Sequence, residues 1–146
     1  MKTVIQRVKK GMLCVGKEPR GEIGSGLVVL VAVEKGDTEK DCEFLAGKIL
    51  SMRIFENSSG KMDYSLMDIK GGIIVISQFT LCANCRRGNR PDFTEAESPD
   101  KAVVLYDKFV ELIKKSAAKT VQGEFGKYML VEIHNDGPVT IILNSR

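Results

Sequence analysis

The chain has 146 residues, of which 43% are hydrophobic and 28% charged, so its length and composition are those of one globular domain. Its 22 lysines and arginines exceed its 19 aspartates and glutamates by only three, a balance that permits a nucleic-acid partner without predicting one. Because His134 is the only histidine, one chain cannot form a metal site with two histidine ligands, and a Ser-His-Asp triad would have to use it. We expect a single domain over residues 1–146.

No segment has the length of a membrane span, because the longest apolar run, residues 27–33, has only seven residues. The apolar stretch near the N-terminus is also too short for a signal peptide. We therefore expect a cytoplasmic protein without membrane contact, in which the four cysteines are reduced.

The first part of the chain is predicted to form strands. Apolar alternation predicts strands at 3–8 and 12–15, which would pair across a turn at 9–11. A second turn is predicted at 18–21. The valine-rich run 27–33 contains no polar residue, as expected for a strand that is buried on both faces.

Two helices are predicted from their start signals and apolar stripes. Thr38 followed by Asp41 is similar to a capping box. Ser98-Pro99-Asp100 places a capping residue, a proline and an acid at the start of the second helix. The stripes consist of Cys42, Leu45, Ala46, Ile49 and Leu50 in the first helix, and of Ala102, Leu105, Tyr106, Phe109, Leu112 and Ile113 in the second.

The remaining apolar segments predict further strands. A short strand is expected at 53–55 and a strongly apolar one at 73–81. The last two strands, 128–134 and 139–143, would be separated by a turn at 135–138. Two helices among antiparallel hairpins predict an α+β domain with a mostly antiparallel sheet.

The end of the predicted strand 73–81 is the first candidate site. It carries Ser77, Gln78, Phe79 and Thr80, and strand ends that lead into loops commonly carry binding sites. A hydroxyl there could act as a nucleophile if the fold supplied a base, but none is adjacent in sequence. The alternative is a strand end whose hydroxyls satisfy neighbouring backbone groups.

Gly137-Pro138 is the second candidate. A cis peptide bond before the proline would turn the backbone sharply and could direct carbonyl oxygens outward together. The alternative is an ordinary trans turn, which the frequencies of the two isomers favour.

The third candidate is the basic part of the predicted loop 82–94. Arg86, Arg87 and Arg90 could bind phosphate through paired hydrogen bonds. The alternative is a solvated loop whose positive charge is partly cancelled by the carboxylates within 92–97.

Cys82 and Cys85 could form a redox pair or half of a zinc site. No helix follows them to lower a thiolate pKa, and no second cysteine pair completes a zinc site, so the alternative is two small side chains in a loop. His134 is expected to be structural or exposed rather than catalytic.

Taken together, several segments are similar to those of the D-aminoacyl-tRNA deacylases. They are residues 1–8, 21–24, 33–37, 53–55 and 60–62, with the two signatures Ser-Gln-Phe-Thr-Leu at 77–81 and Asn-Asp-Gly-Pro-Val-Thr at 135–140. Both signatures are intact, and the resemblance runs from Met1 to about Asn144. It implies a cytoplasmic homodimer that hydrolyses the ester between a D-amino acid and the 3′-terminal adenosine of tRNA. It also implies removal of mischarged glycine, with no metal, cofactor or DNA partner.

The resemblance also assigns roles to residues. Residues 77–80 would line the pocket of one subunit, while Gly137 and Pro138, joined by a cis peptide, would reach in from the other and exclude an L side chain. Arg7 would brace that turn. The pocket for the adenosine would be formed by Gly123, Phe125 and Met129, and tRNA phosphates would meet Arg86, Arg87 and Arg90.

The expected mechanism uses backbone groups. The N–H groups of Phe79 and Thr80 would stabilise the oxyanion, and the ribose 2′-hydroxyl would help to activate water. Residues 82–85 are Cys-Ala-Asn-Cys, where family members often have Tyr-Ala-Asp or a similar run. The two cysteines leave open whether oxidation affects the enzyme. The rival functions are a non-catalytic tRNA-binding module, whose binding would be salt-sensitive, and a thiol-redox protein.

Overall fold

The computed structural model describes residues 1–86, 88–116 and 119–146. Its helices are α1 (Glu39–Ser51), the short 3-10 helix η1 (Phe79–Cys82) and α2 (Pro99–Lys114). Its strands are β1 (Lys2–Val15), β2 (Glu18–Ile23), β3 (Gly26–Ala32), β4 (Phe55–Glu56), β5 (Met62–Tyr64), β6 (Gly72–Ser77), β7 (Lys119–Gln122) and β8 (Met129–Asn144).

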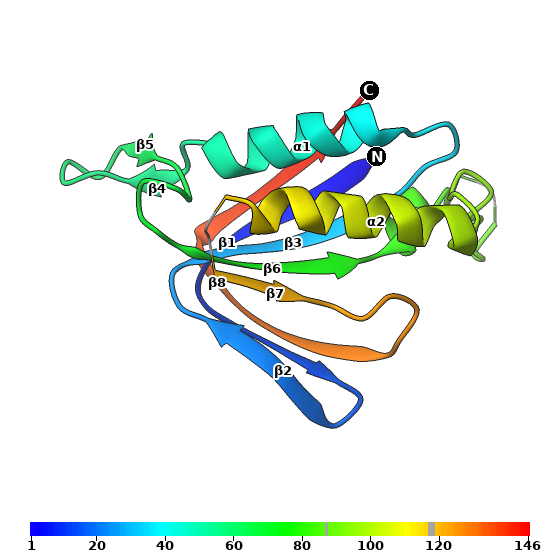
Figure 1. Ribbon diagram of the computed structural model, residues 1–146, viewed down its shortest axis with the longest axis horizontal. Coiled ribbons are helices and arrows are strands. Elements are labelled where there is room, and N and C mark those ends of the chain that lie inside the picture. The colour runs from blue at the N-terminus through cyan, green and yellow to red at the C-terminus, as the bar shows by residue number, and fades with distance from the viewer. Residues whose placement is uncertain (87, 117–118) are drawn as a thin grey trace.

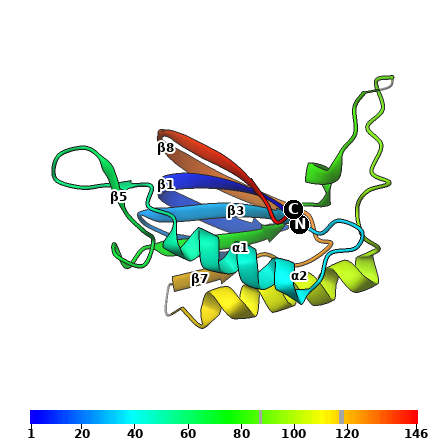
Figure 2. The ribbon, with the colours of Figure 1, turned by 90° about the horizontal axis from the view of Figure 1, so that it is seen from above.

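The main sheet is mixed and has the order β2-β1-β3-β6-β7, with β8 paired to β1, whereas β4 and β5 pair in a separate sheet. The pairings of β1 with β2, β3 and β8 are antiparallel, whereas β3–β6 and β6–β7 are parallel. Helices α1 and α2 lie side by side over one face of the sheet (Figures 1 and 2). The predicted α+β class is confirmed, and the two parallel pairings are a feature that the hairpin pattern did not indicate.

The two central strands are buried on both faces, as their sequences predicted. In β3, Leu27, Val29 and Val31 contribute to the core beneath the helices, while Val28 faces the other side of the sheet. β6 alternates in the same way, because side chains of successive strand residues point to opposite faces. The other residues of the second core come from β1, β2, β7 and β8.

The predicted hairpin within the first 15 residues is wrong, because β1 is one continuous strand. Gly11 is needed there for packing and not for a turn. A Cβ on Gly11 would lie 3.0 Å from Ile74 Cδ1 and 3.2 Å from Val28 Cγ2, so glycine lets the strand pass close over the second core. The predicted turn at 18–21 is also wrong, since these residues lie in β2 and the chain reverses at Gly16, which has φ +59°.

The predicted turn at 135–138 does not separate two strands either. β8 runs from Met129 to Asn144, and both of its halves pair with β1. Gln6 is opposite Thr140 and Val8 is opposite Asn135, so four residues of β8 stand opposite Arg7 alone. The extra residues form an irregularity within β8. The strand continues past this irregularity because β1 is long enough to pair with β8 on both sides of it.

Other differences concern short elements. β6 ends at Ser77, and the predicted continuation to residue 81 is wrong because the chain turns into η1. The predicted strand at 53–55 lies at 55–56, and the short strands β2, β5 and β7 were not predicted. Both helices and the capping box of Thr38 and Asp41 are confirmed. In the described part of the chain, no helix is long and apolar enough to span a membrane.

Candidate active site

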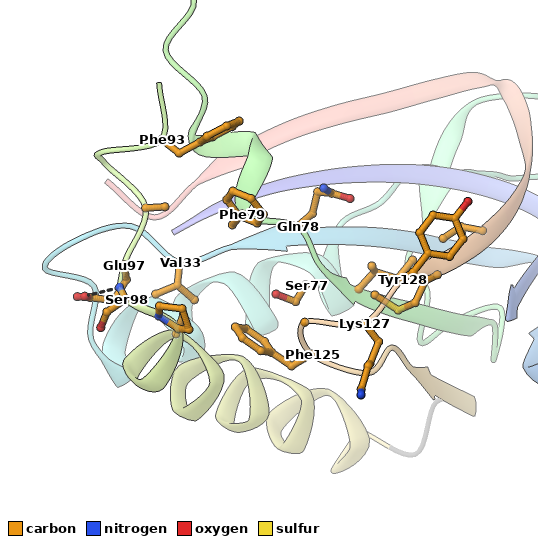
Figure 3. A pocket seen from close by; sticks show the side chains of 17 residues that line it. Val33, Ser77, Gln78, Phe79, Phe93, Glu97, Ser98, Phe125, Lys127 and Tyr128 are labelled. Atoms are coloured by element: carbon orange, nitrogen blue, oxygen red, sulfur yellow. Dashed lines mark hydrogen bonds between the residues drawn. The ribbon is translucent and has the colours of Figure 1, made fainter. Parts of the chain in front are cut away.

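A cavity of about 720 Å³ opens beside the C-terminal end of β6 (Figure 3). Its walls come from the end of β6 and η1, from the start of α2 and the segment before it, and from the start of β8 with the loop that precedes it. This volume is typical of a pocket for one small organic ligand. The lining residues are Val33, Ile76, Ser77, Gln78, Phe79, Phe93, Ala96, Glu97, Ser98, Pro99, Ala102, Phe125, Gly126, Lys127, Tyr128, Met129 and Val131.

The first signature lies at the centre of this pocket. Ser77, Gln78 and Phe79 line it, and the Gln78 N–H donates to the Val31 carbonyl at 2.7 Å, which ties the end of β6 to β3. Thr80 is exposed on η1 and is not a lining residue. Its hydroxyl accepts a hydrogen bond from the Gln78 amide at 2.6 Å, and within the described residues no base is hydrogen-bonded to it.

The opposite wall is held by a buried tyrosine that the sequence assigned only to the helix stripe. The single hydroxyl proton of Tyr106 is shared between the carbonyl oxygens of Val75 (2.9 Å) and Gly123 (3.1 Å). The Gly123 N–H in turn donates to Val75 O at 2.8 Å. The ring of Tyr106 lies 6.0 Å from that of Phe125, and burial raises the pKa of its phenol. The bonds of Tyr106 therefore hold the segment before β8 against β6.

Of the predicted adenosine residues, Phe125 and Met129 line the pocket and Gly123 lies behind them. A Cβ on Gly123 would lie 2.9 Å from Met129 Sδ and 3.3 Å from Val75 O. The glycine is needed because no side chain fits between β6 and Met129.

Replacing Tyr106 with phenylalanine should displace this wall. The change removes the donor to the buried Gly123 carbonyl, which should lower the free energy of unfolding by about 1–2 kcal/mol. Because this wall of the pocket shifts, the KM for the expected tRNA substrate should rise several-fold while kcat changes less. Urea unfolding and steady-state kinetics of the deacylation expected from the sequence would measure both effects. The exposed Tyr64, replaced in the same way, should show neither effect, and an unchanged KM in Tyr106→Phe would contradict this positioning role.

The second signature lies elsewhere in the chain. The Gly137-Pro138 peptide is cis, and Gly137 has φ +115°. Arg7, which is only 4% exposed, donates from Nε to the Asp136 carbonyl at 3.3 Å and from Nη1 to the Ile54 carbonyl at 2.7 Å. Its Nη2 also pairs with Glu56 Oε1 at 3.3 Å. Arg7 thus contacts the turn that it was expected to brace.

The two signatures are not brought together within one chain. Val131 lines the pocket, and Gly137 lies six residues further along the same strand. At the rise of a β-strand this corresponds to about 20 Å. Gly137 and Pro138 therefore do not belong to the pocket of their own chain.

The basic loop leaves the body of the molecule after η1 (Figure 2), and Phe79 and Phe93 at its two ends line the pocket. It is closed by a backbone bridge between Asn84 and Asp92, and Phe93 at its base lies edge-on to Phe79, with centroids 5.1 Å apart. Arg86 and Arg90 are exposed on it, and Arg87 lies outside the described residues.

The other reactive side chains do not gather at a site. Cys82 is buried, which raises the pKa of its thiol, whereas Cys85 is exposed. This arrangement does not favour the reactive thiolate that a redox pair needs. His134 is exposed on β8. Among residues 1–86, 88–116 and 119–146, no three histidine, cysteine, aspartate or glutamate side chains form a metal-binding group.

The sequence did not indicate that Phe93, Tyr128 or the start of α2 would line the pocket. Ser98-Pro99 signalled only a helix start, and the approach of that start to β6 depends on the packing of α2 over the sheet. The helical spacing of Tyr106 predicted only a core residue, and it gave no indication of the carbonyl groups that its hydroxyl bonds.

Comparison with known proteins agrees with these signatures. The family model of D-Tyr-tRNA(Tyr) deacylase matches residues 4–144. The chain belongs to the D-aminoacyl-tRNA deacylase family. A D-aminoacyl-tRNA deacylase of Aquifex aeolicus is 55% identical over 146 residues, covering 100% of this chain and 99% of the relative. That of Thermotoga petrophila is 50% identical over 145 residues, covering 99% and 97%.

Two solved structures share the deacylase fold. One, described as a c-Myc DNA unwinding element binding protein, has a TM-score of 0.93 at 42% identity, with 100% of this chain and 99% of that chain covered. The other, a probable eukaryotic D-amino acid tRNA deacylase, has a TM-score of 0.86 at 18% identity and covers 98% of each chain. The resemblance predicted from the sequence is confirmed, and the chain is a hydrolase of this family.

Proposed function

We propose that the chain acts as one deacylase domain that hydrolyses the ester between a D-amino acid, or mischarged glycine, and the 3′-terminal adenosine of tRNA. The observation that carries this proposal is the pocket that joins Ser77–Phe79 to Phe125 and Met129. Its largely apolar walls suit an adenosine, and polar backbone and side-chain groups lie at the end of β6, where the ester would be.

The proposed enzyme is a cytoplasmic homodimer. Since Gly137 and Pro138 lie about 20 Å along β8 from their own pocket, they can reach a substrate only in the pocket of a second copy. In the described part of the chain β8 pairs with β1 alone, so one edge of a 16-residue strand remains open. The exposed Leu130 and Ile142 on β8 further favour an interface along it.

The proposed chemistry needs no side-chain nucleophile. Phe79 and Thr80 are the first residues of η1, and the first N–H groups of a helical turn have no partner within it. They would stabilise the oxyanion formed when water attacks the ester carbonyl. The ribose 2′-hydroxyl would help to activate that water, and the ester C–O bond then breaks as the 3′-oxygen takes up a proton.

Selection of the D isomer would follow from exclusion. The carbonyl groups at Gly137-Pro138 of the partner would hold the α-amino group and occupy the space that an L side chain requires. A D side chain would point outward, so its identity would matter little. Glycine has no side chain to exclude, which accounts for the proposed cleavage of glycyl-tRNA.

The exposed loop beside the pocket would meet the tRNA backbone through Arg86, Arg87 and Arg90. A non-catalytic tRNA-binding module is the alternative, and it would need only this loop. The two functions differ in whether the ester is cleaved.

One experiment tests the proposed function. The protein is incubated with D-Tyr-tRNA and with L-Tyr-tRNA, and the remaining ester is followed with time. We expect the D ester to be cleaved about 100-fold faster or more. Salt-sensitive binding without cleavage of either ester would establish the binding module instead, and equal cleavage of both would overturn the proposed selection.

Replacing Thr80 with alanine should leave most of this activity. Among the residues that the structure describes, no base is in hydrogen-bonding contact with the Thr80 hydroxyl, and the backbone N–H that we assign to the oxyanion remains in the variant. We expect kcat to change by about threefold or less, whereas removal of a true nucleophile typically costs about 10⁴-fold or more. Single-turnover deacylation of D-Tyr-tRNA would decide between them. A 10⁴-fold loss with an unchanged circular dichroism spectrum would restore Thr80 as the nucleophile.

A further inference from the structure

Tyr128 stands at the mouth of the pocket without a role in the proposed reaction. In the single chain Tyr128 is 80% exposed, the highest fraction among the large apolar residues that the structure describes. Its position is well defined, because the Gly16 N–H donates to its carbonyl oxygen at 3.0 Å and Met129 begins β8 directly after it. Figure 3 shows the ring beside the pocket, at the opposite end from Phe93 and Glu97.

The size of the pocket places the rest of the RNA outside it. A cavity of about 720 Å³ accommodates one small organic ligand, such as an adenosine carrying an amino acid. The nucleotide that precedes this adenosine must therefore leave through the mouth. Single-stranded RNA ends are recognised chiefly by stacking of their bases on exposed aromatic rings.

We propose that the ring of Tyr128 stacks on the base of the nucleotide that precedes the terminal adenosine. This inference rests on the proposed function for the identity of the ligand. A ring that is 80% exposed offers a face for such a base, and Tyr128 adjoins Met129 on the adenosine wall. The contact is tolerant of base identity, because every base has an aromatic face.

The test is a binding cycle on the full-length protein. Its probes are two uncharged RNA hairpins with a single-stranded 3′ end, identical except that the second has an abasic ribose before the terminal adenosine. In the wild type, the abasic RNA should bind about tenfold more weakly. Tyr128→Ala should weaken binding of the intact RNA by a similar factor, and it should then bind the two RNAs equally. Equal binding of the two RNAs by Tyr128→Ala would show that the tyrosine ring and the base contact each other directly.

Three controls separate stacking from other causes. Tyr128→Phe keeps the ring and should retain the discrimination between the two RNAs. Tyr64→Ala removes an exposed tyrosine from β5, outside the residues that line the pocket, and should bind both RNAs like the wild type. Because no charge is lost, the salt dependence of binding in Tyr128→Ala should keep the wild-type slope.

The inference is overturned if Tyr128→Ala still discriminates between the two RNAs, or if the wild type does not. Since binding requires no hydrolysis, these outcomes are decided whether or not D-Tyr-tRNA is cleaved. Failure of the proposed function appears separately, as intact D-Tyr-tRNA after incubation with the wild type.

Discussion

Gly137→Ala should lower the deacylation rate of D-Tyr-tRNA by about 100-fold, the loss that a displacement of about 1 Å can cause at a reacting centre. Gly137 has φ +115°, a backbone conformation that L side chains rarely adopt. An added Cβ would also lie 3.0 Å from Arg7 Nη2 and 3.0 Å from Val139 Cγ2. Arg7 cannot yield freely, because it is bonded to the carbonyls of Ile54 and Asp136. The segment of Gly137 and Pro138 must therefore move.

The matched control is Gly60→Ala. Gly60 also has a positive φ, +75°, but an added Cβ there meets nothing within 4 Å. Gly60→Ala should lower the free energy of unfolding by about 1–2 kcal/mol through backbone strain. Gly137→Ala should lower it by at least as much, because its Cβ also meets Arg7 and Val139. Only Gly137→Ala should lose activity, measured as kcat/KM at a temperature well below both melting points. Wild-type activity in Gly137→Ala would exclude this turn from the active site.

Gly26→Ala should be the most damaging single methyl addition for the fold. Gly26 and Gly72 are directly opposed where the parallel strands β3 and β6 begin to pair. A Cβ on Gly26 would overlap the Gly72 carbonyl oxygen and lie 2.9 Å from the Gly72 nitrogen. Both obstacles are backbone atoms, so the strands must separate. We expect the free energy of unfolding to fall by about 3 kcal/mol or more.

Gly24→Ala tests this explanation two residues earlier. Gly24 is exposed and its added Cβ would meet nothing within 4 Å, so its unfolding free energy should stay within about 0.5 kcal/mol of the wild type. Urea denaturation of both variants gives the comparison. Equal midpoints for Gly26→Ala and the wild type would contradict the close approach of β3 and β6. Gly26→Ala should also shift Gln78 in the pocket wall, because the Gln78 N–H is held by its hydrogen bond to Val31 of β3.

Local signals predicted the elements whose structure depends on near neighbours. The capping box at Thr38 and the Ser98-Pro99 start define helices by hydrogen bonds and dihedral preferences within one turn. The apolar run of β3 predicted burial on both faces, because alternate residues of such a strand need two apolar surroundings. The same signals failed at Gly11 and at residues 135–138, where glycine and proline usually indicate turns.

The candidate site also combines features that local sequence signals predict with features that they do not. The two intact signatures were sufficient to predict the family and to name the residues expected to act. The tertiary structure was needed to show that Ser77–Phe79 and Phe125–Met129 face one another and that Tyr106 holds them. It was also needed to show that Gly137 lies about 20 Å away along β8. Such placements depend on strand pairing and on helix packing between residues far apart in the chain. No local pattern encodes those contacts, because their free energy exists only once the sheet has formed.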